Sequence, residues 1–289
     1  MVLDDTFGHG FNSHRLHQFG RKLEPYLEYS LQRAMIRYYC SGFDPNNAFG
    51  HGLGDMFQAE LKKTKSIVYI PGGSAKIEKV RNQYLPRFSK YFENVGIIFD
   101  EVTLITPDSS QLESQEKIKN ADFIMLMGGN PFEQKKMCNN LGLLPLLKDY
   151  DGLMLGFSAG AMLMSKNIII TPCSDEYPDF RIEEGLNLDK LSIYPHSNTS
   201  SDVYPETLVV GDETYKRDDF ITVAKKYGSF YLLQDNIRDD GFIDVSIIKS
   251  VNGDLEFYTE NEGKIWNVND KIMLIHPKQV KNKNINSFR

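Results

Sequence analysis

Short apolar runs alternate with amphipathic stretches along the chain up to residue 185. The runs are continuously apolar, as in "IVYI" at 67–70 and "FIMLM" at 123–127, instead of alternating with polar residues. Between the runs, apolar residues recur at the three- and four-residue spacing of a helix. Continuously apolar strands separated by helices are typical of a parallel sheet with both faces covered. The pattern therefore predicts an α/β domain with a mostly parallel central sheet.

The same pattern sets the order of the expected elements. Strands are expected at 35–43, 66–73, 95–105, 122–130, 152–158, 167–173, 191–197 and 230–235. Helices are expected at 23–35, 54–63, 76–96, 114–121 and 131–150, with another beginning at Ala159. After residue 242 the pattern predicts a hairpin meander with a turn at Asn252 and Gly253.

No linker rich in glycine, serine or proline divides the chain. We therefore expect an N-terminal helical extension at 1–35 and one α/β domain at 36–245. A small C-terminal β-hairpin extension at 246–289 is expected to pack on the same domain. The domain itself is expected to be a three-layer sandwich, with helices on both faces of the sheet.

Composition narrows the classes of function. The chain has 289 residues, of which 41% are hydrophobic and 25% charged, as in ordinary globular proteins. Its net charge of -6 argues against nucleic-acid binding, which needs a basic surface. No apolar run approaches the roughly 20 residues of a membrane span, and the N-terminus does not resemble a signal peptide. We expect a cytoplasmic protein with no nucleic-acid or membrane partner, and the sequence leaves a homodimer open.

Metal and disulfide chemistry have little support in the sequence. The three cysteines are few, odd in number and far apart, which does not indicate a disulfide framework or a zinc site. His14 and His17 are spaced to share a helix face, and His9 is close in sequence. No carboxylate or thiol is placed to complete a metal shell with them, so this site is the weakest alternative.

The segment "LGFSAGAM" at 155–162 carries the clearest chemical signal. An apolar strand leads into Gly-x-Ser-x-Gly and a helix follows, which is the context of a nucleophile elbow. In such a turn Ser158 would stand at the carboxyl end of the strand, and the N–H of Ala159 would point toward a developing oxyanion. The alternative is a small serine that eases a tight turn in the core.

A nucleophilic serine needs a base. Among the six histidines, His196 in "YPHS" and His276 in "LIHP" each follow an apolar strand, although either could be a hydrogen-bonded loop residue. The segment "MGGNPF" at 127–132 also ends a strand and opens a helix. Its backbone N–H groups could complete an oxyanion hole, and Asn130 is placed to cap the helix.

These three motifs, in this order, resemble the dipeptidase E/cyanophycinase family of serine peptidases over roughly residues 36–245. The matching segments are "GGNPF", "GFSAGAM" and "PHS". The resemblance implies a fold like that of class I glutamine amidotransferases, with serine replacing cysteine at the elbow. It also implies Ser158 as the nucleophile, His196 as the base, and the backbone of Gly129 and Ala159 as oxyanion donors.

The resemblance also points to an acid and to substrate contacts. Aspartyl-dipeptidase members place a glutamate after a late strand, where this chain has Asp235 in "LLQDNIR". Asp175, in "TPCSDEY", matches another acid near the family's site and is the second candidate, although either carboxylate could be a solvated loop residue. Arg217, in "ETYKRDDF", and Asn130 are the expected substrate contacts. The implied substrate is a short peptide, and no cofactor or metal is implied.

Two other classes of function stay open. An α/β-hydrolase-type esterase shares Gly-x-Ser-x-Gly and would use His276, with Asp235 or Asp244 between the serine and the histidine. It ranks lower because the chain has no HGGG-type oxyanion loop. A non-catalytic binding protein on the same scaffold would leave Ser158 unreactive.

Overall fold

The computed structural model divides the chain into two units, residues 1–34 and 35–289. The residues that it describes are 34–44, 49, 52–61, 65–73, 77–172, 179–197, 204–210, 213–235, 237–239, 241 and 243–279, with backbone alone at 208–210, 213–214 and 279. The helix expected at 23–35 lies almost wholly outside the described residues.

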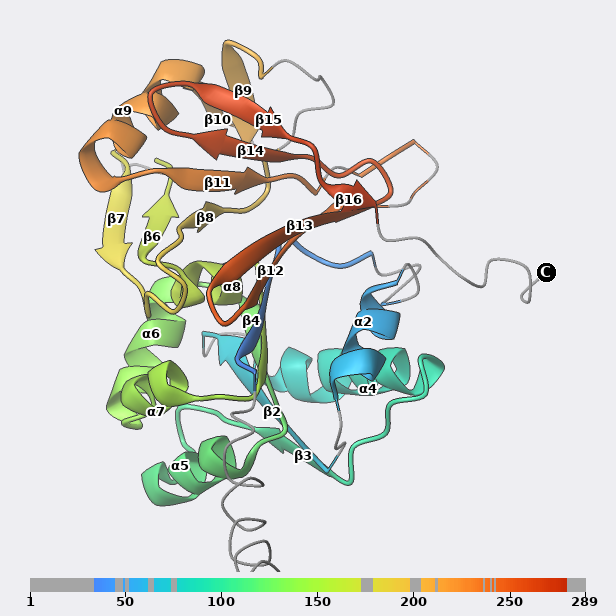
Figure 1. Ribbon diagram of the computed structural model, residues 1–289. Helices are drawn as coiled ribbons and strands as arrows, with labels where there is room; N and C mark the ends of the chain where they lie inside the picture. The colour runs from blue at the N-terminus through green and yellow to red at the C-terminus, as the bar shows by residue number, and fades with distance from the viewer. Residues whose placement is uncertain are drawn as a thin grey trace, which may run out of the picture. The chain divides into compact units, whose positions relative to one another are not determined.

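A sheet of eight strands forms the centre of the described unit (Figure 1). Its parallel part contains β1 (Ile36–Cys40), β5 (Leu153–Phe157), β4 (Phe123–Gly129), β2 (Ser66–Gly72) and β3 (Glu101–Leu104), in that spatial order. These strands come from the apolar runs of the sequence, so the predicted parallel sheet is confirmed. Parallel strands end at one edge of the sheet, which places the residues after β1, β2, β4 and β5 near one another.

The C-terminal hairpin extends this same sheet. Strands β12 (Val245–Val251) and β13 (Asp254–Glu260) are antiparallel and are joined by the expected turn at Asn252 and Gly253. β12 pairs antiparallel with β1, and the short β16 (Lys278–Gln279) pairs with β13. The segment expected as an extension packed on the domain therefore contributes three strands to its central sheet.

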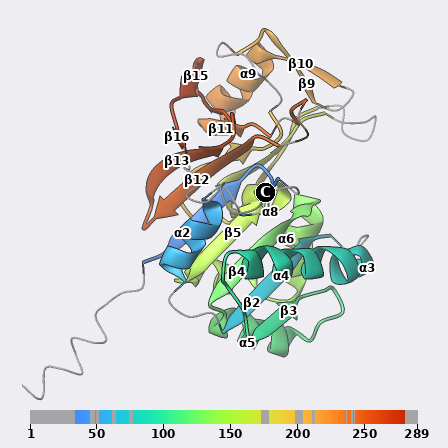
Figure 2. The ribbon, with the colours of Figure 1, turned by 90° about the vertical axis from the view of Figure 1, so that its right-hand side faces the viewer.

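Helices cover both faces of the sheet. Figure 2 views it from the side of α2 (Leu53–Glu60) and α4 (Leu85–Asn94). The opposite face carries α5 (Gln111–Asn120), α6 (Pro131–Asn140), α7 (Leu144–Asp149) and α8 (Ala159–Met164). Successive strand residues point to opposite faces. Tyr38 and Ile67 therefore pack with the first set of helices, whereas Tyr39 and Val68 pack with the second.

A second sheet of six strands was not part of the sequence prediction. Its members, in spatial order, are β15 (Ile272–Ile275), β14 (Ile265–Val268), β11 (Phe230–Leu233), β8 (Ile193–Tyr194), β6 (Asn167–Ile170) and β7 (Arg181–Glu184). The two-stranded sheet β9 (Thr207–Val210) and β10 (Glu213–Lys216) leads into α9 (Arg217–Tyr227). Strands β11 and β8 are parallel, which matters for the site described below.

Some element boundaries differ from those predicted. The helix expected at 131–150 is two helices, α6 and α7, separated by Gly142 with a φ of 65°. The helix expected at 76–96 contains α3 (Ile77–Lys79), a π-helical turn η1 (Val80–Tyr84) and then α4. Pro86 has no N–H to donate to the preceding turn, which favours such a break in the α-helical pattern.

Candidate active site

Ser158 stands on a sharp turn between β5 and α8. Its φ of 50° and ψ of −117° are unusual for a residue with a side chain and mark local backbone strain. Its N–H donates to the Cys40 carbonyl at 3.0 Å, which anchors the turn to the neighbouring strand β1. A Cβ on Gly156 would lie 2.7 Å from Ala161 N, and one on Gly160 would lie 2.0 Å from the Leu126 carbonyl oxygen. The two glycines thus allow α8 to pack directly against the strands below it.

His196 and Asp235 follow two adjacent parallel strands. His196 comes two residues after β8, and Asp235 comes two residues after β11. Tyr194 of β8 is in register with Leu232 of β11, so both chains leave the sheet at the same edge. The hydrogen bond from Ser197 N to the Leu233 carbonyl, at 3.0 Å, continues this pairing beyond the strand ends.

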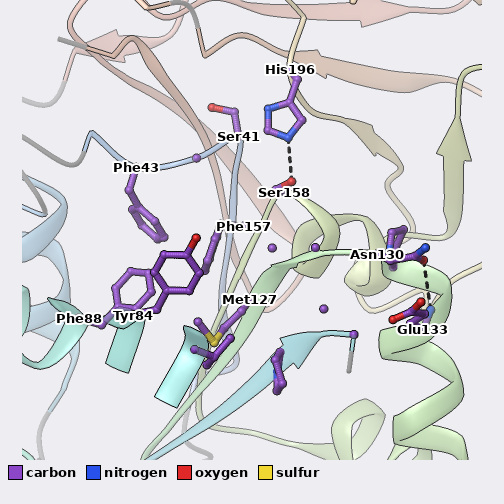
Figure 3. A pocket seen from close by; sticks show the side chains of 18 of the residues that line it. Ser41, Phe43, Tyr84, Phe88, Met127, Asn130, Glu133, Phe157, Ser158 and His196 are labelled. Carbon is purple, nitrogen blue, oxygen red and sulfur yellow. Dashed lines mark hydrogen bonds between the residues drawn. The ribbon is translucent and has the colours of Figure 1, made fainter. Parts of the chain in front are cut away.

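A chain of hydrogen bonds joins the three side chains. Ser158 Oγ lies 2.7 Å from His196 Nε2. A dashed line marks this hydrogen bond in Figure 3. His196 Nδ1 contacts Oδ2 of Asp235. With Nδ1–H donating to the carboxylate, Nε2 keeps its lone pair for the serine proton. This is the arrangement by which an imidazole can act as a general base toward a hydroxyl group.

Asp235 is more buried than its histidine partner: its side chain is 13% exposed, against 46% for His196. Burial raises the pKa of Asp235, while the hydrogen bond and the positive charge available on His196 act in the opposite direction. The contact with His196 therefore favours the ionised form of Asp235, against the effect of burial.

The end of β4 lies directly beside the serine. A Cβ on Gly128 would lie 3.4 Å from Ser158 Cβ. Gly129 has a φ of 137°, and a Cβ there would lie 2.1 Å from the Gly72 carbonyl oxygen, so only glycine fits this approach of two strands. Ala159 is the first residue of α8, where helix N–H groups have no partner within the helix. Gly128 and Ala159 thus adjoin Ser158, and Gly129 lines the same cavity.

Asn130 caps helix α6, as its sequence position predicts. Its Oδ1 accepts hydrogen bonds from the N–H groups of Phe132 at 2.9 Å and Glu133 at 3.2 Å. Asn130 also lines the cavity beside Ser158. The side-chain carbonyl of Asn130 thus accepts hydrogen bonds from the first turn of α6, while the residue also lines the cavity.

A cavity of about 830 Å³ opens at Ser158 and His196. Its lining is mainly apolar and comes from the β1–α2 connection, the η1–α4 helix, the end of β4, the start of α6, and β5. The residues that line it are Ser41, Gly42, Phe43, Pro71, Gly72, Gly73, Val80, Tyr84, Arg87, Phe88, Tyr91, Met127, Gly128, Gly129, Asn130, Pro131, Phe132, Glu133, Phe157, Ser158, Ile170, His196 and Ile243.

Other predicted site residues are not in this constellation. Arg217 begins α9 and does not line the cavity, so its role in substrate binding stays a prediction. His276 follows β15 in the second sheet, and it is His196 that contacts Ser158. Asp244 is buried, and its Oδ1 accepts a hydrogen bond from Glu262 N at 3.0 Å. Asp175 lies outside the described residues, as do the histidines at 9, 14 and 17.

Sequence reasoning missed the aromatic residues that line the cavity and a hydrogen-bonded contact that holds the segment before Asp235. Ser41 Oγ donates to the carbonyl of Gln234 at 2.9 Å and accepts from Ser246 N at 3.0 Å. This serine therefore ties the Asp235 loop to the end of β1. Residues 41 and 234 are 193 positions apart, and no local pattern signals their contact.

Within the described residues, no three histidine, cysteine, aspartate or glutamate side chains are grouped so that they could hold a metal ion. None of the helices in this part of the chain combines the length and the apolar character needed to cross a membrane.

Comparison with known proteins gives the family. The model of peptidase family S51 matches residues 41–234, a segment that contains Ser158 and His196 and ends one residue before Asp235. The chain belongs to peptidase family S51. The resemblance to dipeptidase E that the motifs indicated is thereby confirmed.

Individual relatives of this S51 chain agree with the family. A protein named Peptidase E from Escherichia coli O6:K15:H31 (strain 536) is 29% identical over 157 residues, which are 53% of this chain and 64% of that protein. The match therefore spans less than two thirds of the relative. The crystal structure of a peptidase from an acI-B1 Actinobacterium has a similar fold, with a TM-score of 0.55 and 15% identity. That similarity covers 86% of this chain and 97% of the other.

Proposed function

We propose that this S51 chain is a serine peptidase that hydrolyses short peptides through an acyl-enzyme. In this proposal Ser158 is the nucleophile, His196 is the general base, and Asp235 orients the imidazole. No cofactor or metal takes part. The observation that carries the proposal is the hydrogen-bond chain from Asp235 through His196 to Ser158, which ends at the mouth of a cavity.

The reaction would proceed in two halves. His196 Nε2 takes the hydroxyl proton as Ser158 Oγ attacks the carbonyl carbon of the peptide bond. The carbonyl oxygen becomes an oxyanion and accepts hydrogen bonds from the N–H groups of Gly129 and Ala159. The C–N bond then breaks, and the leaving amine receives the proton from His196. Water, deprotonated by His196, hydrolyses the ester on Ser158 and restores the hydroxyl group, while Asp235 stabilises the imidazolium in both halves.

The peptide bond as substrate is supported by membership of family S51 and by similarity to Peptidase E. We also infer that the helices and the parallel strands form the three-layer sandwich of class I glutamine amidotransferases, with serine at the position of their cysteine. Helices packed on both faces of a mostly parallel sheet support this inference.

The test is a set of alanine variants assayed on a dipeptide library and with a fluorophosphonate probe. Ser158→Ala and His196→Ala are expected to lose about 10³-fold or more in kcat/KM, because each removes a group that bonds or transfers a proton in the reaction. His276→Ala is the matched control and is expected to keep wild-type activity. Thermal unfolding of each variant checks that the fold is intact.

Three results would contradict the proposal. Normal turnover by Ser158→Ala would show that another group attacks the substrate. Loss of reactivity in His276→Ala with retention in His196→Ala would instead support the esterase order of residues. A wild-type protein that neither reacts with the probe nor cleaves any peptide would be a binding protein on a peptidase scaffold.

A further inference from the structure

Aromatic rings form one wall of the cavity beside Ser158. The ring centroids of Phe43 and Phe157 are 4.7 Å apart, those of Phe43 and Phe88 are 5.6 Å apart, and those of Phe88 and Phe157 are 5.7 Å apart. Each ring thus contacts the other two, and Tyr84 lines the cavity with them. Figure 3 shows these rings gathered on one side of Ser158. Together these four residues are called the aromatic wall.

The aromatic wall begins at the nucleophile itself. Phe157 is the residue before Ser158 and ends strand β5. A Cβ on Gly128 would lie 3.0 Å from the Phe157 ring and 3.4 Å from Ser158 Cβ, so the ring and the serine border the same point of the β4 backbone. A substrate carbonyl held at Ser158 Oγ therefore has its nearest side chain within reach of these rings.

Charged groups are sparse along the cavity. Among its lining residues, Arg87 and Glu133 are the two from the lysine, arginine, aspartate and glutamate types. Arg87 is a solvent-exposed residue of α4 that hydrogen-bonds Tyr91. Glu133 lies across the cavity from the aromatic wall, next to Asn130 (Figure 3). A carboxylate placed among the rings of Phe43, Phe88 and Phe157 would lose water and gain no donor from them.

We propose that the peptide residue whose carbonyl Ser158 attacks carries a large apolar side chain, aromatic in preference to acidic, and that this side chain packs against the aromatic wall. The inference rests on the proposed peptidase function and specifies its substrate class. An aromatic side chain gains both apolar burial and favourable ring contacts in such a pocket. An aspartate side chain gains neither.

The first experiment compares four free-amino p-nitroanilides, those of Phe, Leu, Ala and Asp, at one pH and ionic strength. The kcat/KM for Phe is expected to exceed that for Asp and for Ala by about tenfold or more, with Leu in between. The same comparison is made with the diphenyl phosphonate analogues of Phe and Asp. In these, Ser158 Oγ forms a bond to phosphorus and phenol leaves, so the rate of inactivation reports side-chain preference without peptide turnover.

A matched pair of variants connects the preference to the wall. Phe43→Leu is expected to reduce the Phe-over-Ala ratio by about threefold or more, because one ring of the wall is lost. Phe99→Leu is the control. Phe99 is also half-buried, and its ring centroid lies 5.2 Å from that of Phe92 and 6.2 Å from that of Phe123. It does not line the cavity. This variant is expected to keep the wild-type ratio, which separates pocket chemistry from loss of core packing.

The outcomes separate the two proposals. Ser158-dependent reaction that is fastest with the Asp compounds, and that loses this preference in Arg87→Gln, would overturn the aromatic pocket and leave the peptidase function standing. Equal rates with all four side chains would also overturn it. Absence of any Ser158-dependent reaction, with substrates, phosphonates and a fluorophosphonate, would remove the proposed function itself.

Discussion

At the scale of single residues, the position of Asp235 decides how the proposed base is held. The carboxyl group is largely buried, and burial raises its pKa, whereas contact with the His196 imidazole favours the ionised form. Since Asp235 contacts His196 and not Ser158, its carboxylate can affect the reaction only through that histidine. We therefore regard Asp235 as a positioning residue, which acts on Ser158 through the orientation and charge of His196.

Replacement of this carboxylate should impair the reaction while the fold survives. Asp235→Asn is expected to lower kcat/KM by about 10² to 10⁴, since an amide cannot stabilise the imidazolium and can favour the wrong tautomer. Asp235→Glu is expected to recover part of the loss and to shift the acidic limb of the pH–rate profile. The measurements are kcat/KM as a function of pH and the midpoint of thermal unfolding.

A nearby aspartate provides the control for this experiment. Asp239 lies four residues further along the same connection, in an exposed turn. Asp239→Asn should keep both the activity and the pH profile of the wild type. If Asp235→Asn also kept them, the carboxylate would be a structural loop residue and the acid would have to be sought elsewhere.

At the scale of elements, the elbow depends on how closely helix α8 approaches strand β4. A Cβ on Gly160 would lie 2.0 Å from the Leu126 carbonyl oxygen, and backbone atoms cannot rotate away as a side chain does. Gly160→Ala is expected to lower the free energy of unfolding by about 3 kcal/mol, the upper range for overpacking. Activity should fall as well, because α8 carries Ala159 N–H beside Ser158. Urea unfolding and kcat/KM are the two measurements.

The control for this prediction is a glycine whose replacement strains the backbone but causes no steric clash. Gly228 has a φ of 99°, and a Cβ there would meet no atom within 4 Å. Gly228→Ala is expected to cost about 1 kcal/mol through its backbone conformation, with unchanged activity. Equal losses in the two variants would show that α8 can move off β4 without steric penalty.

Elements with a continuous apolar run could be predicted from sequence, and strands that depend mainly on pairing with a neighbouring strand could not. The run at 67–70 forms β2 because both faces of the strand are buried. The segment "LGFSAGAM" forms the elbow because its small residues allow the sharp turn, whatever the rest of the chain does. In contrast, β7 reads "RIEE" and was not predicted, because it has no apolar run and is stabilised by its pairing with β6. The strand expected at 191–197 is present, but as β8 it has only two residues, Ile193 and Tyr194.

The same contrast applies to the candidate site: residues in local motifs could be predicted, and contacts between distant segments could not. Ser158 and His196 carry local motifs, so their types and strand-end positions could be predicted. The aromatic wall could not, because Phe43 and Phe88 lie 45 positions apart and meet only when η1 and α4 pack on the sheet. Tyr84, at the end of η1, reaches the cavity from a π-helical turn that no hydrophobic period describes.

At the scale of the whole molecule, a buried ion pair connects the two sheets around the site. Arg37 of β1 is 4% exposed, and its Nη1 lies 3.0 Å from Oδ1 of Asp189, just before β8. Tyr39 and Ser250 also donate to this carboxylate, at 2.5 and 2.7 Å. The segment that leads to His196 is thus fixed to the centre of the sheet that carries Ser158. A one-sided break of such a pair leaves a buried charge uncompensated.

A second buried carboxyl group ties the C-terminal hairpin to helix α2. Glu260 ends β13 and is 4% exposed, and the backbone N–H at Leu53 donates to it. Its Oε1 has no hydrogen-bond partner within the described part of the chain. Burial raises the pKa of Glu260 to about 7, and the nearby Asp44 acts in the same direction. The folded protein therefore binds a proton at Glu260 more tightly than the unfolded chain does.

This difference makes the stability of the whole protein depend on pH. Between about pH 4.5, where an unfolded glutamate ionises, and about pH 7, the free energy of unfolding should fall as the pH rises, because ionisation then favours the unfolded chain. Glu260→Gln should remove most of this slope and be more stable than the wild type at pH 8, by on the order of 3 kcal/mol. Asp235, whose pKa is also raised, makes the free energy of unfolding depend on pH with the same sign in the wild type and in Glu260→Gln. Urea unfolding at pH 5 to 8 measures the effect, with Glu262→Gln, whose side chain is 75% exposed, as the control expected to keep the wild-type slope. An unchanged slope in Glu260→Gln would mean that the Leu53 N–H group holds Glu260 ionised at neutral pH.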